Sequence, residues 1–585
     1  MSISGTQIYY AIKNKKPNDF ANVDADRLTL WMLKNTVNIN EIQSLFLQDN
    51  ENDQNIVLLK DMRKIESYWP EDQNHSEDYI HVVVEPPVPT GQVGAHSLSP
   101  SNADNDMLKR QKLIKEYRDT IRCGLEANSP SVKARPEKFF KDQQTNPILN
   151  GRPLENTGPP IALFNNTFSL FLNDFHNENL EITSDFLIWT EELILAAADS
   201  YDNEEERNEK IRVILMEKLG AILLIESGKI KQKCKSDGIF TTTSGLFFVH
   251  SSKNDPTIQG AIYYRDYWSQ QNVEQIRNCC CAPSFIIAMV GAWFCILGGV
   301  FLSRVVVQPL TDLISLTINL QDFDEVRRIA RLFYSLSRAL QQLSLFYQNL
   351  KLTPSDQRFF PYIRQFQFKG EDINFTYINE IFDDHTRTIW KAKKENGQII
   401  VVKFTPKYNI EAHNICSSIG RAPDLFYCSD DNEAKTLWGF KMVIMEYISA
   451  ISLDQKFIKG EIKTESCKVI YEDIKQAIGL LHEKNFVFAD LRASNILIID
   501  TEENQRAMLV DFDWCGKSDE DRYSPSMNKN ISWPPGAKPR TLLRKDHDLY
   551  WLDVLLREFL RYCTLIFDMP VGSHMSTASR ICSSG

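Results

Sequence analysis

The spacing of apolar and polar residues along the chain predicts several separate groups of helices and strands. Apolar residues recur at the helical period in two stretches, 323–350 and 467–483, which we expect to be amphipathic helices. Further helices are predicted over 204–220, 263–275 and 410–419. Short runs rich in β-branched and aromatic residues predict strands over 28–33, 79–85, 238–249, 425–428 and 441–447.

One pair of runs predicts a β-hairpin. Arg387–Lys393 and Gln398–Phe404 both have strand character, and Lys394-Glu395-Asn396-Gly397 lies between them. An Asn-Gly pair between two such runs is a strong short-range signal for a hairpin, because both residues tolerate the positive φ of the turn. We therefore expect two neighbouring antiparallel strands here.

A long apolar run, Ser284–Leu302, has two interpretations. It holds 19 uncharged residues between Arg277 and Arg304, which just meets the length of a membrane-spanning helix. The alternative is a pair of buried strands, since Gly291 and the pair Gly298-Gly299 interrupt the run, which is rich in Val, Ile and Phe. We favour the strands, and a protein anchored in the membrane through 284–302 is the alternative.

The composition indicates which classes of protein this chain resembles and excludes others. The chain has 585 residues, of which 43% are hydrophobic and 24% charged, and this is typical of folded soluble protein of several domains. The net charge of −11 argues against a uniformly basic nucleic-acid coat protein. Twelve cysteines are too few for a disulfide framework. Residues 1–16 lack a basic start and an apolar stretch, so no conventional signal peptide is expected.

Changes of composition predict the domain boundaries. Pro86-Pro87-Val88-Pro89 and the Gly-, Ser- and Asn-rich stretch after it predict a flexible linker. We expect a compact unit at 1–87, the linker at 88–107, a helical and α/β region at 108–350, a further domain at 375–570, and a tail at 571–585.

The strongest chemical signal lies between Phe486 and Gly516. Asp490 is followed five residues later by Asn495, and two apolar runs joined by a polar turn lead to Asp511-Phe512-Asp513. This order resembles the catalytic loop and the metal-binding segment of protein kinases. The resemblance implies a bilobal kinase-like domain that uses ATP and Mg²⁺. Asp490 is then the catalytic base, and Asn495 and Asp511 ligate the metal ion.

Upstream and downstream residues agree with this resemblance. Lys403 ends an apolar run, as the phosphate-binding lysine of kinases does, and Glu411 on the next predicted helix is its expected partner. Glu446 follows Val443-Ile444-Met445, where the resemblance places the hinge beside adenine. Asp548 resembles the acidic residue at the start of the helix that braces the catalytic loop.

The chain also departs from the kinase pattern. No glycine occurs in 378–387, where a Gly-rich loop covers the phosphates in kinases, and Phe488-Ala489 replaces His-Arg before the base. Asp513 replaces the glycine of the metal-binding segment. Two alternatives therefore stay open: an atypical kinase of the Ser/Thr type, or a non-catalytic pseudokinase that acts by binding or dimerisation.

The N-terminal unit resembles the N-terminal domain of crinkler effectors. The similarity spans most of residues 8–87. Leu30-Trp31-Met32-Leu33-Lys34 matches the family signature loosely, and His81–Pro87 matches its terminal strand and junction. The resemblance implies a partial ubiquitin-like (β-grasp) fold. It also implies a secreted protein that acts inside host plant cells, typically in the nucleus, on host nuclear proteins, during symbiotic or pathogenic colonisation.

The middle region resembles the restriction-endonuclease-like module that precedes kinase domains in fungal crinklers. The similarity rests on Asp237, on Asp255–Tyr264, which contains Gln259, and on Ser284–Leu302. A nuclease of this kind needs further acidic metal ligands. Because 246–253 contains none, nuclease activity is expected to be lost. A DNA-damaging nuclease effector remains an alternative, with nucleic acid as its partner.

The residues and the resemblances together predict a multidomain α/β and α+β protein. It combines a partial ubiquitin-like N-terminal domain, a degenerate restriction-endonuclease-like middle and a bilobal kinase-like C-terminal domain. A homodimer is an alternative assembly, and no association with membranes is expected.

Overall fold

The computed structural model describes ten ranges of the chain. They are 29–37, 56–58, 80–85, 103–124, 129–220, 223–224, 246–250, 255–382, 387–529 and 531–567. Most of the predicted linker, Asp237 and the predicted tail lie outside them. The chain divides into one unit made of 96–410 and 424–447, and another made of 1–95, 411–423 and 448–585.

Three strands are described in the N-terminal region. They are β1 (Thr29–Val37), β2 (Ile56–Leu58) and β3 (Ile80–Glu85). They form an antiparallel sheet in the order β2-β1-β3, in which Trp31 lies opposite both Leu58 and Val83. The strands predicted at 28–33 and 79–85 are confirmed, whereas the full β-grasp fold stays a prediction.

The unit of 96–410 and 424–447 begins with a series of helices. They are α2 (Ala103–Gly124), α3 (Pro130–Lys133), α4 (Pro136–Thr145), α5 (Asn166–His176), α6 (Ser184–Ala198), α7 (Glu204–Leu219), α8 (Pro256–Trp268), α9 (Glu274–Cys279), α10 (Phe323–Gln348) and α12 (Asp431–Thr436). Short 3-10 helices are η4 (Leu154–Asn156), η5 (Ile161–Leu163) and η6 (Asp356–Phe359). The helices predicted at 204–220 and 323–350 are confirmed. The start of α2 at Ala103 shows that the predicted linker extends too far.

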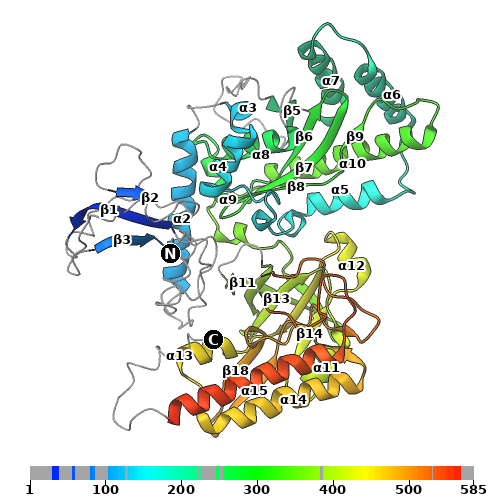
Figure 1. The fold of residues 1–585 in the computed structure, drawn as a ribbon. Helices are drawn as coiled ribbons and strands as arrows, with labels where there is room; N and C mark the ends of the chain where they lie inside the picture. Colours follow the sequence, from blue (N-terminus) through cyan, green and yellow to red (C-terminus); the bar gives the residue numbers. More distant parts are fainter. Residues whose placement is uncertain are drawn as a thin grey trace. The chain divides into compact units, whose positions relative to one another are not determined.

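A mixed sheet lies among these helices (Figure 1). Its strands are β4 (Leu223–Leu224), β5 (Leu246–His250), β6 (Ser284–Val290), β7 (Trp293–Phe301), β8 (Val305–Pro309) and β9 (Ile314–Ser315). β4, β5 and β6 are parallel, whereas β6, β7 and β8 are antiparallel. The run 284–302 is thus the β6–β7 hairpin, and the alternative of a membrane helix there is wrong. None of the helices described has the length and apolarity needed to cross a membrane.

Both faces of β6 are buried, which explains its continuous apolar sequence. Phe285 and Ile287 belong to a core shared with α5 and α10, whereas Ile286 and Ala288 belong to a core shared with α8. Successive side chains of a strand point to opposite faces, so both faces need apolar residues. The middle region is therefore an α/β/α sandwich. Its likeness to a restriction endonuclease stays a prediction.

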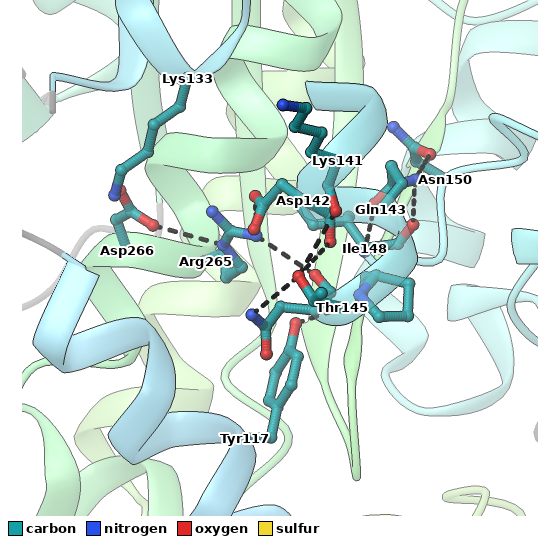
Figure 2. Close-up of polar contacts among 12 residues, drawn as sticks. Tyr117, Lys133, Lys141, Asp142, Gln143, Thr145, Ile148, Asn150, Arg265 and Asp266 are labelled. Carbon is teal, nitrogen blue, oxygen red and sulfur yellow. Dashed lines mark hydrogen bonds and ion pairs between the residues drawn. The ribbon is translucent and has the colours of Figure 1, made fainter. Parts of the chain in front are cut away.

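A buried network of charges joins α3 and α4 to α8 (Figure 2). Arg265 of α8 is 2% exposed, and its Nη1 donates to Asp142 Oδ2 at 2.6 Å. Its Nε donates to Asp266 Oδ1 at 3.3 Å, and Lys133 Nζ donates to Asp266 Oδ2 at 2.8 Å. Each charge has an opposite partner, which buried ions require. The network fixes three helices on the outside of the sheet.

The helix predicted at 263–275 is wrong in its position. α8 starts at Pro256, after Asp255, whose side chain accepts hydrogen bonds from Thr257 N and Ile258 N. An N-cap aspartate followed by proline is a usual start for a helix. α8 ends at Trp268, and Gln259, to which the endonuclease-like resemblance pointed, is buried within it.

A six-stranded antiparallel sheet completes this unit. Its strands are β10 (Gln365–Phe368), β11 (Glu371–Glu380), β12 (Ile389–Lys394), β13 (Ile399–Thr405), β14 (Leu425–Cys428) and β15 (Lys441–Glu446), in the order β10-β11-β12-β13-β15-β14. The predicted hairpin is β12–β13, and Gly397 in its turn has φ of 90°. The strands predicted at 425–428 and 441–447 are confirmed as well.

The core of this sheet is continuous with the core of the α/β/α sandwich. Tyr377 of β11 stacks on Phe360 with ring centroids 5.5 Å apart. Trp390 of β12 meets Phe164 edge-on at 6.5 Å. The two sheets therefore share one hydrophobic core, and residue 375 is not a boundary between separately packed domains.

The other unit contains the remaining part of the kinase-like region. Its elements are α11 (Ile410–Ser417), β16 (Ile451–Ser452), α13 (Leu453–Lys459), η7 (Thr464–Ser466), α14 (Cys467–Glu483), β17 (Phe486–Val487), η8 (Ala493–Asn495), β18 (Ile496–Asp500), β19 (Gln505–Leu509), β20 (Gly516–Lys517) and α15 (Lys545–Phe567). The helices predicted at 410–419 and 467–483 are confirmed. α14 buries Ile470, Ile474 and Ile478 on one face, as its period predicts.

Candidate active site

The β18–β19 hairpin brings Asn495 and Asp511 to the same end of a small sheet. Ile496 lies opposite Leu509 in this antiparallel pair. Val510 N donates a hydrogen bond to Asn495 O at 3.0 Å, one residue beyond the last pair. Asp511 follows directly, so the fold places it beside Asn495, as the order of residues predicted.

Asp490 lies in the loop that leads to this hairpin, and its carboxylate is held by two side chains. It is 6% exposed. Arg492 Nε donates to Oδ1 at 2.5 Å and Arg492 Nη2 donates to Oδ2 at 2.7 Å. Asn495 Nδ2 donates to Oδ2 at 2.9 Å and to the Asp490 carbonyl at 3.0 Å. The carboxylate is therefore fixed in position, with a guanidinium group on one side and an amide on the other.

Burial is the main cause that raises the pKa of Asp490 above its usual value. The hydrogen bonds and positive charge of Arg492 act in the opposite direction, and the negative charge of Asp511 raises the pKa further. The two carboxylates thus lie close enough to interact. Opposed effects of this kind are common at catalytic sites, where a carboxylate must be ready to accept a proton.

Two residues of the site have left-handed backbone conformations. Ala489 has φ of 72° and Asp511 has φ of 73°. Such a conformation costs about 1–2 kcal/mol for a residue with a side chain. It persists only where the surroundings enforce it. Asp548 of α15 supplies that support at Ala489, because its Oδ1 accepts from Ala489 N at 2.9 Å and its Oδ2 accepts from Phe488 N at 2.8 Å.

The support from Asp548 confirms the bracing contact that the sequence predicted. Asp548 is fully buried, and His482 Nε2 of α14 lies 3.0 Å from its Oδ2. One carboxylate therefore links α14, α15 and the strand that leads to Asp490.

An aromatic stack joins α11 to the two functional loops. The ring of Phe512 lies parallel to His413 of α11, with centroids 4.7 Å apart, and meets Phe488 edge-on at 5.3 Å. All three side chains are fully buried. His413 Nε2 is 2.7 Å from Pro423 O, which fixes the ring. The stack sets the position of Asp511 through its neighbour Phe512.

A second buried carboxylate holds β19 in place. Asp473 of α14 accepts two hydrogen bonds at 2.7 Å from Arg506 and one at 3.1 Å from Ala507 N. It also pairs with Arg421 at 2.8 Å. Because these contacts tie β19 to α14, they fix the strand that delivers Asp511.

The sequence did not identify several of these residues. His413, Asp473 and Arg421 lie far from the catalytic loop along the chain, and no local spacing pointed to them. Arg492 lies inside the recognised motif, two residues after Asp490, so its position alone could have marked it.

The three residues expected to bind the nucleotide lie in other elements. Lys403 is in β13 opposite Val443, and Glu446 ends β15 opposite Ile400. Glu411 lies on the exposed side of α11, whose buried residues include Ala412 and His413. Lys403 and Glu411 belong to different units of the chain, so the ion pair expected between them stays a prediction.

The ligands at the end of the hairpin fit a magnesium ion. Mg²⁺ prefers oxygen ligands, usually one or two carboxylates together with phosphates and water. Asp511 supplies a carboxylate and Asn495 an amide oxygen, since its Nδ2 is already bonded to Asp490. Within the described ranges, the end of the hairpin included, no three His, Cys, Asp or Glu side chains gather as a metal site, so the protein ligands here are Asp511 and Asn495 alone.

Comparison with protein families finds matches in two separate regions of the chain. Residues 7–85 match the crinkler effector protein N-terminal domain, and residues 426–536 match the protein kinase domain. The second match includes Asp490, Asn495 and Asp511 and begins after the expected phosphate-binding lysine.

Individual relatives are plant kinases. The CBL-interacting serine/threonine-protein kinase 12 of Arabidopsis thaliana is 26% identical over 111 residues, which are 19% of this chain and 22% of that kinase. The calmodulin-binding receptor-like cytoplasmic kinase 1 of Arabidopsis thaliana is 24% identical over 204 residues, which are 32% of this chain and 43% of that kinase. The chain thus spans less than half the length of either relative.

The two family matches and the arrangement of the loops agree with each other. The chain carries a crinkler effector N-terminal domain and, toward its C-terminus, a protein kinase domain.

Proposed function

We propose that this chain is a secreted crinkler effector that acts inside host plant cells, in the nucleus, and that its kinase domain phosphorylates host nuclear proteins on serine or threonine. The N-terminal match supports the effector role. The similarity to serine/threonine kinases supports the reaction. The observation that carries the proposal is the convergence of Asp490, Asn495 and Asp511 at one end of the β18–β19 hairpin.

The proposed reaction follows from the positions of these groups. Asp490 orients the acceptor hydroxyl and takes its proton as the oxygen forms a bond to the γ-phosphorus of ATP, and the bond from that phosphorus to ADP breaks. Arg492 and Asn495 keep the Asp490 carboxylate in place. Magnesium, when bound by Asn495 and Asp511, neutralises charge on the phosphates.

Transfer of label from γ-labelled ATP to a general protein acceptor tests the reaction. The full chain is compared with Asp490→Asn and Asp511→Asn. As a control, Glu472→Gln removes a negative charge from the exposed side of α14. We expect Asp490→Asn to lose about 10²–10⁴-fold in rate, as removal of a catalytic base does. We expect Asp511→Asn to lose rate as well, because it removes a metal ligand, and the control to keep its rate. Equal labelling by all four proteins would refute the catalytic role.

A non-catalytic role is the second candidate, and one observation favours it. The chain has no glycine in 378–387, so a backbone cradle for phosphates is not provided there in the usual way. In that case the domain binds nucleotide without transferring phosphate. A rise in melting temperature with ATP and Mg²⁺, together with no labelling of any acceptor, would favour this alternative.

The proposed location has its own test. A tagged full chain and a chain without residues 1–87 are delivered from outside to plant cells and imaged. We expect the full chain in the nucleus and the shortened chain outside the cell. A full chain that stays in the cytoplasm would contradict the nuclear part of the proposal.

A further inference from the structure

A segment close to the candidate active site has a charge opposite to that of the whole chain. Residues 522–545 include six basic residues and no acidic one, whereas the chain as a whole has a net charge of −11. The six basic residues are Arg522, Lys529, Lys538, Arg540, Arg544 and Lys545. All but Lys545 are exposed. We call these six residues the basic segment.

Hydrogen bonds hold the two ends of this segment together. Tyr523 N donates to Thr541 O at 2.9 Å, and Leu543 N donates to Asp521 O at 2.9 Å. The Tyr523 hydroxyl lies 3.0 Å from His547 Nδ1 in the interior. The basic side chains are therefore presented from a fixed loop, which lowers the entropy lost when they bind a partner.

The loop lies directly against the catalytic residues. Trp533, near its middle, stacks on Trp514 with centroids 5.3 Å apart. The guanidinium group of Arg492 lies over the Trp533 ring at 5.6 Å, and the same group is bonded to Asp490. A substrate whose hydroxyl reaches Asp490 therefore passes close to the loop that carries the basic segment.

Few of the six charges are compensated. In the parts of the chain that the structure describes, Arg544 has the one ion pair of the segment, to Asp519 at 3.7 Å. Arg522 Nη1 donates to the carbonyl of Arg540 at 3.0 Å, which leaves its charge without an acidic partner there. The segment thus presents a positive surface on one side of the site.

We propose that the basic segment recognises acidic peptides, so that the preferred acceptor hydroxyl is flanked by Asp or Glu residues. This inference rests on the proposed kinase function. A peptide suits the surface better than a nucleic acid, because the acidic residues Asp519, Glu520 and Asp546 border the segment and would repel a continuous phosphate backbone. Separate carboxylates can bind the individual basic groups. Each exposed contact contributes about two- to fivefold in affinity.

The test uses three peptides with one central serine, flanked by Glu, Gln or Lys at otherwise identical positions. The full chain is compared with Lys538→Glu/Arg540→Glu/Arg544→Glu. A matched control, Lys459→Glu/Lys468→Glu/Lys475→Glu, changes the same number of exposed charges on α13 and α14. We expect the acidic peptide to be phosphorylated most efficiently by the full chain. The first variant should lose about 10–100-fold in kcat/KM for that peptide, and the control less than about threefold.

Binding measurements separate this inference from the proposed reaction. Fluorescence anisotropy with the labelled acidic peptide needs no phosphate transfer. Binding that depends on the basic segment, without any transfer, would support recognition of acidic peptides and refute the catalytic role. Transfer with equal efficiency to all three peptides would refute the inference alone. Displacement of the acidic peptide by a single-stranded oligonucleotide of higher affinity would also overturn it, in favour of nucleic acid.

Discussion

Replacing Asp548 with asparagine tests how the catalytic loop is held. The wild-type carboxylate is fully buried and accepts hydrogen bonds from Phe488 N at 2.8 Å, Ala489 N at 2.9 Å and His482 Nε2 at 3.0 Å. An asparagine can accept at one end only, because its Nδ2 is a donor. In Asp548→Asn, the carbonyl oxygen can take the place of either carboxylate oxygen. In both orientations the amide group faces a buried backbone N–H, of Phe488 or of Ala489, which loses its acceptor.

The size of the effect follows from these contacts. A hydrogen bond to a charged group contributes about 1.5–3 kcal/mol, and a buried donor without an acceptor costs about 1–3 kcal/mol. Because such terms are not additive, we take a combined loss of about 3–5 kcal/mol. Domain stability is about 5–15 kcal/mol, so this loss is a large part of the total. The melting temperature should fall by roughly 6–20 °C.

Calorimetry and hydrogen exchange provide the assay. We expect a lower transition for Asp548→Asn and faster amide exchange in the peptide that contains Phe488 and Ala489. Asp546→Asn is the matched control, since Asp546 is exposed in the same first turn of α15. It should change stability by less than about 1 kcal/mol. Equal shifts for the two variants, or unchanged exchange in the loop, would refute the bracing role of Asp548.

Three further predictions concern the site, the buried sheet and helix α14. Arg492→Ala removes a group that lowers the pKa of Asp490, so the pKa of Asp490 should rise. The acidic limb of the pH profile of kcat/KM should then move to higher pH, and an unmoved limb would show that Asp490 does not determine it. Gly298→Ala places a Cβ 2.3 Å from Ile161 Cδ1 in the buried sheet. The free energy of unfolding, measured by chemical denaturation, should fall by about 1–3 kcal/mol. An unchanged free energy would contradict the packing of β7. In Gly479→Ala, in the middle of α14, the added Cβ meets no atom within 4 Å. Alanine favours the helix over glycine, so the free energy of unfolding should rise by about 0.5–1 kcal/mol and the melting temperature with it. A lower melting temperature would argue against that helix.

The elements with local signals were predictable from the sequence. The β12–β13 hairpin has an Asn-Gly turn, and α14 has an amphipathic period along its whole length, so both were found with nearly correct ends. The arrangement of Asp490, Asn495 and Asp511 was also accessible, because one hairpin within a short stretch of chain brings them together.

Other features depend on contacts that the sequence does not reveal. α8 was misplaced because every residue from Gln259 to Trp268 is buried, so it shows no alternation of apolar and polar faces. The support of β19 by Asp473, Arg506 and Arg421 joins residues 33 or more positions apart. Such pairs cannot be matched from one sequence, since many charged residues are equally plausible partners.

The shared core of the two sheets in 96–410 and 424–447 limits how evolution can recombine this gene. Kinase domains often move between proteins as exchangeable cassettes, which requires that a crossover leave no apolar face uncovered. A crossover near residue 375 would separate Tyr377 and Trp390 from Phe360 and Phe164 and leave four aromatic rings in water. A crossover ahead of α2 spares these contacts. The kinase region of this chain should therefore be inherited together with the α/β/α sandwich.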